Sequence, residues 1–305
     1  MQNDYLKRIE PFLKQYSEIK PVKTNIQSDY KYDSNIKILV FDIYGTLIVS
    51  SSGDLDKATA TSKHVITALN QGGFFFVDVN TQNKNAGQLI NLFHQTIVEE
   101  QNKLKQQNYP YPEVDIIKVW SYCINIFEQK NIIKRNNPTC IKTVTTVFEI
   151  LSNKVWPMPE MNKVLNTLQQ KDIPLGIVSN AQFYTPLIMN YFTDNLLSED
   201  EFVNGFDSDI SVFSYKLLRS KPDTYLFKLL AEKIYKKYNI KPAQVLFIGN
   251  DMLKDVWTAK QAGFKTALFA GDKRSLRLHN NDGRCKNIKP DFVLTELLQI
   301  FNIIK

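Results

Sequence analysis

The segment 36–42 carries an unbroken apolar run, Ile38–Phe41, that ends in a carboxylate, Asp42. A strand on the surface of a protein alternates polar and apolar residues, so this run predicts a strand that is buried on both faces. A sheet that contains such a strand needs covering layers on both sides, which favours an α/β fold. In open α/β sheets the ligand-binding crevice lies at the carboxyl ends of the strands, where Asp42 falls.

From Pro157 onward, predicted helices and strands alternate along the chain. We expect strands at 173–179, 209–215, 244–249, 265–269 and 291–293, and helices at 159–170, 183–193, 222–238, 252–262 and up to about residue 303. Such alternation is typical of a parallel sheet with helices on both faces. The predicted core is therefore α/β, with a doubly wound, Rossmann-like parallel sheet.

Between the first strand and this core, the pattern is helical only. Apolar side chains recur at helical spacing in the segments 56–70, 86–107, 113–129 and 138–152. Four helices of this kind can form a compact bundle, so we expect an inserted helical domain. The predicted parts of the chain are an N-terminal extension (1–35), a first core segment (36–55), the helical domain (56–152) and the main core (153–305). The polar stretch Ser50–Asp54 is the candidate hinge by composition.

The N-terminal extension is polar, and residues 5–19 have the pattern of an amphipathic helix with Leu6, Ile9 and Phe12 on one side. We expect this extension to pack on the main domain or to be partly disordered.

Charge and composition narrow the possible partners. The 38 basic and 31 acidic residues give a net charge of +7, but the excess is spread along the chain and forms no nucleic-acid-binding motif. No apolar run approaches the ~20 residues that span a bilayer, and the first residues do not resemble a secretory signal. Three widely spaced cysteines suit a reducing compartment. We therefore expect a cytoplasmic protein that binds neither nucleic acid nor membrane, with its oligomeric state left open.

Four polar clusters stand next to predicted strands or helices of the core. The first is Asp42 with Thr46, the second is Ser179-Asn180 at the end of a strand, and the third is Lys221 at the start of a helix. The fourth is the run 249–255, which contains two aspartates. Phosphoryl transfer through an aspartate needs such a set: an attacking carboxylate, a cation, and hydroxyl and amide donors for the phosphoryl oxygens.

In the order and spacing of these clusters, over about residues 36–303, the chain resembles the haloacid dehalogenase-like hydrolases. Its helical insertion resembles the helical-cap branch of that superfamily. The resemblance implies that Asp42 is the nucleophile and that Thr46 sets its geometry. It further implies that Ser179 and the Asn180 amide bind the phosphoryl group, while Lys221 neutralises charge between nucleophile and phosphate.

The resemblance also implies a cofactor, Mg²⁺, held by Asp42, the backbone carbonyl of Tyr44 and Asp251, with Asp255 in support. Hard oxygen ligands together with a phosphate are what Mg²⁺ prefers. Three neighbouring carboxylates without a cation would also repel one another and raise their pKa values. The implied function is a Mg²⁺-dependent phosphatase that acts on a small phosphorylated metabolite through an aspartyl-phosphate.

Tyr44 departs from this pattern, because phosphatases of the family usually carry an acid–base aspartate two residues after the nucleophile. In its place, we expect Tyr44, a cap residue or a good leaving group on the substrate itself to help the leaving group depart. A tyrosine there resembles the metal-independent 2-haloacid dehalogenases, which lack the acid pair that Asp251 and Asp255 form here. The two acids favour phosphate chemistry over carbon–halogen cleavage. The alternatives are a dehalogenase-type hydrolase and a weakly active or inactive member that acts as a binding protein.

Overall fold

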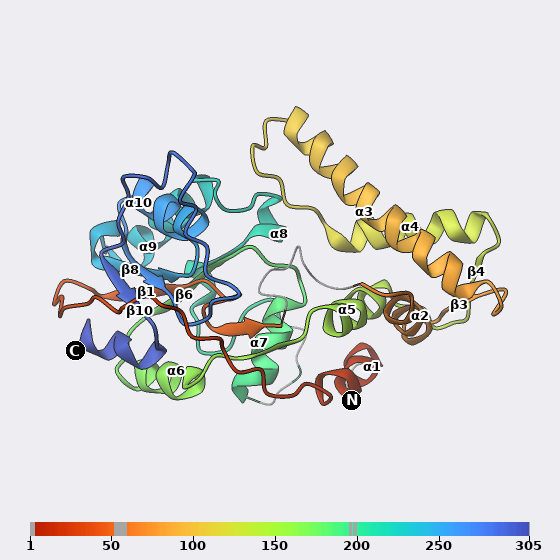
Figure 1. The fold of residues 1–305 in the computed structure, drawn as a ribbon, viewed down its shortest axis with the longest axis horizontal. Helices are drawn as coiled ribbons and strands as arrows, with labels where there is room; N and C mark the ends of the chain where they lie inside the picture. Colours follow the sequence, from red (N-terminus) through yellow and green to blue (C-terminus); the bar gives the residue numbers. More distant parts are fainter. Residues whose placement is uncertain (1–3, 52–59, 195–196, 198–199, 305) are drawn as a thin grey trace.

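The computed structural model describes residues 4–51, 60–194, 197 and 200–304. Its core is a six-stranded sheet in the order β10-β9-β8-β1-β6-β7, and all five neighbouring pairs are parallel (Figure 1). The strands are β1 (Ile38–Phe41), β6 (Leu175–Ser179), β7 (Ser211–Phe213), β8 (Val245–Gly249), β9 (Lys265–Phe269) and β10 (Phe292–Leu294). The central strand β1 pairs with β6 on one side and β8 on the other.

Helices cover both faces of this sheet, which confirms the predicted doubly wound α/β fold. Leu39 and Phe41 of β1 pack into the cluster that holds α6 (Met161–Gln170), α7 (Thr185–Asp194) and η5 (Leu297–Asn302). Ile38 and Val40 face the opposite layer, which contains α9 (Tyr225–Tyr238). Successive side chains of a strand point to opposite faces, so one apolar run serves both layers.

The remaining core elements are short. They are α8 (Ser214–Leu217), α10 (Thr258–Gln261), the 3-10 turns η2 (Ser208–Ile210) and η3 (Pro242–Gln244), and the π-helical η4 (Met252–Trp257). The helix expected at 252–262 is thus a π-helical turn followed by a short α-helix, and the last helix is of the 3-10 type. Within the described ranges, no helix has both the length and the apolar character needed to cross a bilayer.

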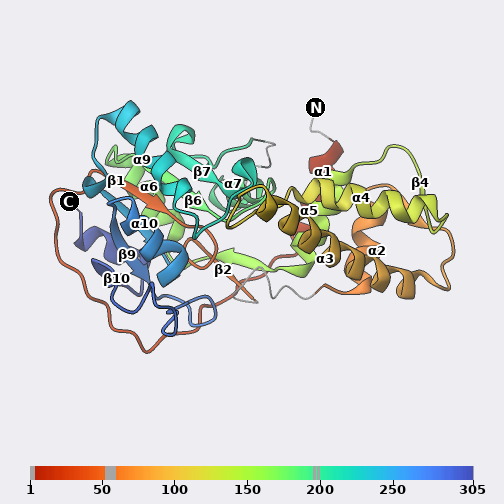
Figure 2. The same cartoon turned by 90° about the horizontal axis from the view of Figure 1, so that it is seen from above.

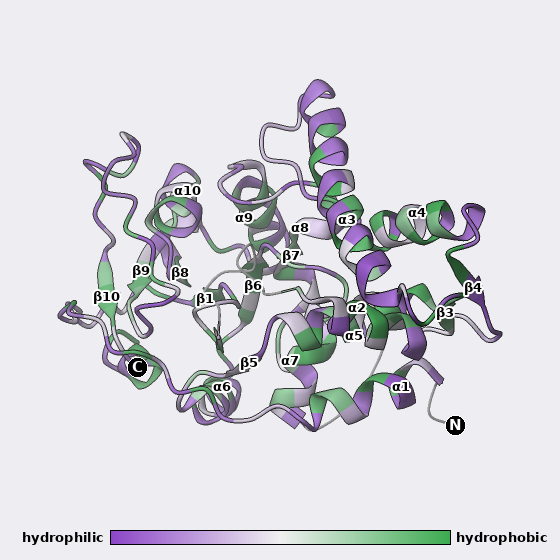
Figure 3. Ribbon diagram, turned by 45° about the vertical axis from the view of Figure 1, so that its right-hand side comes forward, coloured by the Kyte–Doolittle hydropathy of each residue, from purple (hydrophilic) through white to green (hydrophobic). Residues whose placement is uncertain are grey.

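The insertion forms a separate lobe, here called the cap, on the right of Figure 1. Its helices are α2 (Ser62–Gln71), α3 (Gln82–Gln106), α4 (Ile116–Gln129) and α5 (Ile141–Ser152). The rings of Phe93, Trp120 and Phe148 meet at its centre with centroids 4.8 to 5.6 Å apart. In Figure 3, α3 carries a hydrophobic stripe on an otherwise hydrophilic surface, as expected for a helix that buries one side.

The expectation of an all-helical insertion was wrong in one respect. The cap also contains a two-stranded antiparallel sheet of β3 (Phe74–Phe76) and β4 (Ile133–Arg135). Gly72 and Gly73 end α2, and Gly73 has a φ of +81°, a conformation that favours glycine. Three successive phenylalanines follow, and aromatic residues favour strands over helices.

Two antiparallel strands connect cap and core: β2 (Ile48–Ser50) leads out and β5 (Val155–Pro157) leads back. Ser50 donates a hydrogen bond of 2.7 Å to Asn153 Oδ1, which joins the two connections. Of the candidate hinge, residues 52–54 lie outside the described residues, as do positions 56–59 of the first predicted cap helix.

The N-terminal extension packs on the cap as well as on the core. Helix α1 (Asp4–Leu13) lies against α5, and the Tyr5 hydroxyl is 2.9 Å from Thr146 Oγ1 (Figure 2). The following segment runs along the core, where Val22 N donates to Asp272 Oδ1 and Asp29 pairs with Val293. The expected helix over 5–19 ends at Leu13, because the chain turns there and stacks the Tyr16 ring on Phe192, 5.8 Å away.

Candidate active site

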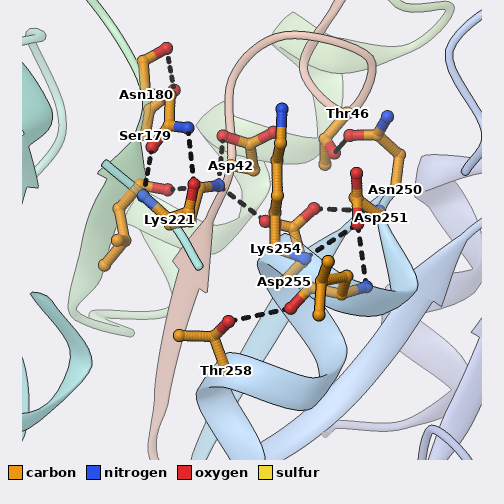
Figure 4. A network of polar contacts seen from close by, with 12 residues as sticks. Asp42, Thr46, Ser179, Asn180, Lys221, Asn250, Asp251, Lys254, Asp255 and Thr258 are labelled. Carbon is orange, nitrogen blue, oxygen red and sulfur yellow. Dashed lines mark hydrogen bonds and ion pairs between the residues drawn. The ribbon is translucent and has the colours of Figure 1, made fainter. Parts of the chain in front are cut away.

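The four polar clusters converge at the carboxyl edge of the sheet (Figure 4). Asp42 follows β1, Ser179 ends β6 and Asn250 follows β8, and these strands are neighbours in the order β8-β1-β6. Lys221 arrives from the loop before α9. Because parallel strands place their carboxyl ends at one edge, residues more than 200 positions apart share one site.

The Lys221 ammonium group is the centre of this site. Its Nζ lies 2.8 Å from Asp42 Oδ1, 2.6 Å from Asp255 Oδ1 and 3.1 Å from the Val178 carbonyl oxygen. The side chain is only 2% exposed. Burial alone would lower the pKa of Lys221, but Asp255 and Asp42 outweigh it and raise this pKa above its usual value. Lys221 is therefore a cation held between two carboxylates.

Asp251 and Asp255 are tied to each other and to η4. The Asp251 carboxylate accepts hydrogen bonds from the backbone N–H groups of Leu253 and Lys254, so it caps the helix. Asp255 Oδ2 accepts a bond of 2.9 Å from Asp251 N. The pKa of Asp255 is raised to about 7, mainly by burial and also by the charges of Asp42 and Asp251, while Lys221 opposes the rise. The site thus holds more carboxylate charge than Lys221 can balance.

Two residues of this region, His279 and Asn250, make contacts that the sequence did not predict. His279, in the loop after β9, places Nε2 2.9 Å from Asp251 Oδ1. Asn250 accepts a bond of 3.3 Å from Thr46 Oγ1 and donates one of 2.7 Å to the Ser275 carbonyl. The hydroxyl of Thr46, which was expected to set the geometry of Asp42, contacts Asn250 at the end of the neighbouring strand β8. The only signal for His279 is the turn-forming run 280–283 beside it.

The predicted phosphoryl-binding residue Asn180 is bound directly to the Lys221 backbone. Asn180 Oδ1 accepts a bond of 2.7 Å from Lys221 N, and Asn180 Nδ2 donates one of 3.1 Å to Lys221 O. Ser179 is fully buried beside it, with a weaker contact of 3.5 Å from its hydroxyl to the Asn180 carbonyl. Two hydrogen bonds therefore join the strand end to the lysine loop.

The Tyr44 hydroxyl makes its side-chain contact with helix α7. Its oxygen is 3.1 Å from Thr185 Oγ1 of α7. Burial, with further contributions from the charges of Glu149 and Asp42, raises the pKa of Tyr44 above its usual value, so the phenol stays neutral. Glu149 of the cap is half-buried, its desolvation raises its pKa, and it accepts bonds from Asn153 and Tyr184. The group expected to assist at Asp42 is therefore a hydrogen-bonding partner of α7.

The donor set suits Mg²⁺ in its chemistry. Asp42, Asp251 and Asp255 offer hard carboxylate oxygens, and their excess negative charge favours a bound cation. In the part of the chain that the structure describes, however, no three Asp, Glu, His or Cys side chains already surround a common point as metal ligands would. A metal would have to draw these oxygens together.

Comparison with known proteins identifies a matching family and proteins of similar fold. A family model described as haloacid dehalogenase-like hydrolase matches residues 36–263. The 2-haloacid dehalogenase of Pseudomonas syringae has a similar fold, with a TM-score of 0.51 and 15% identity over 87% of this chain and 96% of that one. A predicted phosphoglycolate phosphatase from Haemophilus somnus has a TM-score of 0.46 and 17% identity over 88% and 97% of the two chains.

Among curated proteins, the chain is similar to the glyceraldehyde 3-phosphate phosphatase of Pyrococcus furiosus. The two are 30% identical over 86 residues, which is 28% of this chain. The match spans 32% of that relative, about a third of its length.

Proposed function

Because this chain belongs to the haloacid dehalogenase-like hydrolases, we propose that it is a phosphatase that hydrolyses a small phosphate monoester. The observation that carries this proposal is the buried Lys221 ammonium group, which lies 2.8 Å from Asp42 and 2.6 Å from Asp255. A fixed cation beside a nucleophilic carboxylate is what a dianionic phosphoryl group requires, since the two anions would otherwise repel each other.

In the proposed reaction, a carboxylate oxygen of Asp42 attacks phosphorus in line with the ester oxygen. The new O–P bond forms as the ester O–P bond breaks, and the leaving oxygen takes up a proton. Water then hydrolyses the aspartyl-phosphate, which restores Asp42 and releases inorganic phosphate. Lys221, the Ser179 hydroxyl and the main-chain N–H of Asn180 would hold the phosphoryl oxygens, because the Asn180 side chain is already bound to Lys221.

We propose Mg²⁺ as the cofactor, held by Asp42, the Tyr44 carbonyl and Asp251, with Asp255 in support. When bound, it would supply Lewis-acid stabilisation of the negative charge that develops on the phosphoryl group. The similarity to a glyceraldehyde 3-phosphate phosphatase supports a small phosphorylated metabolite as the substrate class.

We expect the purified protein to hydrolyse an activated aryl phosphate when Mg²⁺ is present and to stop when a chelator removes it. Release of phosphate and of the aryl alcohol, measured together, tests this directly. Turnover that survives the chelator would contradict the metal-dependent reaction. No turnover at all with an activated leaving group would contradict the proposed function.

Tyr44 is expected to contribute little to the chemical step, because its hydroxyl contacts Thr185. The variant Tyr44→Phe should keep the kcat for an aryl phosphate within about threefold of wild type, whereas loss of a general acid typically costs ~10²–10⁴-fold. The control is Thr185→Val, which removes the same hydrogen bond from the other side. A loss of a hundredfold or more in Tyr44→Phe alone would make Tyr44 the missing acid.

Tyr44 also favours a second candidate function, cleavage of a carbon–halogen bond by the same carboxylate. In that reaction Asp42 would displace halide from carbon, and water would cleave the resulting ester. Halide release from a 2-haloacid in the presence of chelator, without phosphatase activity, would support this function over the first. A binding protein would show neither reaction but would be stabilised by a phosphorylated ligand.

A further inference from the structure

The cap contacts the core close to Lys221 through the loop that joins α3 to α4, residues 107–115. Figure 1 shows this loop descending from the end of α3 toward α8. Ser220 N donates a bond of 2.8 Å to the Tyr111 carbonyl, and Glu113 N donates one of 3.1 Å to the Leu218 carbonyl. Pro112 forms an antiparallel bridge with Arg219 between these two bonds. The loop is therefore paired with the three residues that precede Lys221.

The side chain of Glu113 reaches a second segment of the core. Its Oε1 accepts a bond of 3.0 Å from Gln182 Nε2, and its Oε2 accepts one of 2.9 Å from Ser214 Oγ. Gln182 Nε2 also donates to the Val114 carbonyl at 3.0 Å. A carboxylate from the cap thus holds two core side chains that lie 32 residues apart in the sequence.

Ser214 carries this contact to the phosphoryl-binding strand end. Its side chain is fully buried, and its oxygen accepts a bond of 2.9 Å from Ala181 N. A serine hydroxyl has one proton, and its contact with Glu113 Oε2 at 2.9 Å is shorter than that with the Ala181 carbonyl at 3.1 Å, so we assign the proton to the bond with Glu113. The chain of hydrogen bonds runs from Ala181 N to Ser214 and from Ser214 to Glu113. Ala181 directly follows Asn180.

The cap loop therefore contacts both segments that form the phosphoryl-binding unit. Glu113 holds the segment 180–182 through Ser214 and Gln182, and the loop backbone holds 218–220. These two segments meet in the reciprocal hydrogen bonds between Asn180 and Lys221. We propose that docking of this loop places Asn180 and Lys221 against Asp42, and that Glu113 is the positioning residue that links the cap to phosphoryl binding.

This inference rests on the proposed function and deepens it. The cap would act on the phosphoryl end of the substrate in addition to enclosing its leaving group. Because coupling between two binding events is reciprocal, a phosphoryl group in the site and a docked loop should stabilise each other.

The kinetic test compares Glu113→Ala and Glu113→Gln with a matched control, Glu100→Ala, in the same cap. Glu100 is exposed and pairs with Lys103 on α3. With an aryl phosphate, Glu113→Ala should lose about tenfold to hundredfold in kcat, because misplacing a positioned group by ~1 Å can cost as much, while KM changes far less. The kcat of Glu113→Gln should lie between those of wild type and Glu113→Ala, since the glutamine amide keeps part of the hydrogen bonding. A kcat of Glu113→Ala within about twofold of wild type would overturn the proposal.

The route through Ser214 is tested by a double-mutant cycle. If Glu113 acts through Ser214, the double variant Glu113→Ala/Ser214→Ala should lose less activity than the product of the two single losses. Independent, multiplicative losses would show that Glu113 does not act along this route.

Hydrogen exchange separates this inference from the proposed function. In Glu113→Ala the amides of Ala181 and Ser220 should exchange faster, while those of α9 stay at the wild-type rate. In the wild-type protein, inorganic phosphate at saturating concentration should slow the exchange of these two amides further, because a bound phosphate and the docked loop stabilise each other. If the wild-type protein shows no phosphatase activity but these amides respond, only the function fails. Unchanged exchange at Ala181 would overturn the positioning role even in an active enzyme.

Discussion

The variant Asp42→Asn is expected to lose phosphatase activity by about 10⁴-fold or more, because an amide cannot form the acyl phosphate. Loss of a nucleophile removes the chemical step itself, so kcat should fall and substrate binding should survive. The fold should survive too, since Lys221 keeps its contacts with Asp255 at 2.6 Å and with the Val178 carbonyl at 3.1 Å. Single-turnover assays with an aryl phosphate measure this loss most directly.

The matched control is Asp291→Asn. Asp291 also binds a lysine, Lys260, at 2.9 Å, but it contacts Thr266 near the start of β9, at the edge of the sheet opposite the site. We expect this variant to keep wild-type kcat. Equal activity of Asp42→Asn and wild type would exclude Asp42 as the nucleophile.

The variant Lys221→Met is expected to lose stability as well as activity. It leaves the carboxylates of Asp42 and Asp255 buried without their cation. Removing one partner of a buried ion pair typically costs about 3–5 kcal/mol, so the free energy of unfolding should fall by that amount. Phosphatase activity should fall as well, because nothing then screens the substrate from the nucleophile.

The pH dependence of Lys221→Met follows from Asp255. The folded-state pKa of Asp255 is raised from 3.8 to about 7, and loss of the lysine removes both its charge and its hydrogen bond, which lower this pKa. For an acid with a raised folded-state pKa, stability is fully present below the unfolded pKa and is lost as the pH rises through the folded one. The deficit of Lys221→Met should therefore shrink as the pH is lowered, for example from about 8 to about 5.

Urea unfolding at several pH values measures this deficit. Lys260→Met is the control, because its pair with Asp291 is about a quarter exposed and should contribute under about 1 kcal/mol. The double variant Lys221→Met/Asp255→Asn should recover part of the lost stability by removing one unpaired carboxylate. A deficit that does not vary with pH would contradict the electrostatic explanation.

Local patterns in the chain were enough to predict the core. The apolar run Ile38–Phe41 specifies a strand buried on both faces, and later alternation of strands and helices specifies a parallel sheet. Parallel strands bring their carboxyl ends to one edge, which is why Asp42, Ser179 and the run 249–255 could be grouped from the sequence alone. Lys221 was included because it stands at the start of a predicted helix, and the family resemblance then implied its role.

Other features have no local signature. The antiparallel pair of β3 and β4 joins segments 57 or more residues apart, and α1 lies on α5 although more than 120 residues separate them in the sequence. The contacts of His279 with Asp251, 28 positions apart, and of Glu113 with Ser214, 101 positions apart, likewise join separate segments. Each depends on where two surfaces meet after folding.

The amino-acid sequence thus determined which segments are strands and helices, which of them are buried, and which polar residues stand at the strand ends, because burial and periodicity are encoded residue by residue. The tertiary structure decided which polar groups share a hydrogen bond: that Tyr44 binds Thr185, and that a cap carboxylate, Glu113, holds the segment after Asn180. Those pairings depend on distances of about 3 Å between groups whose positions are set by the packing of the whole chain, and no single segment specifies that packing.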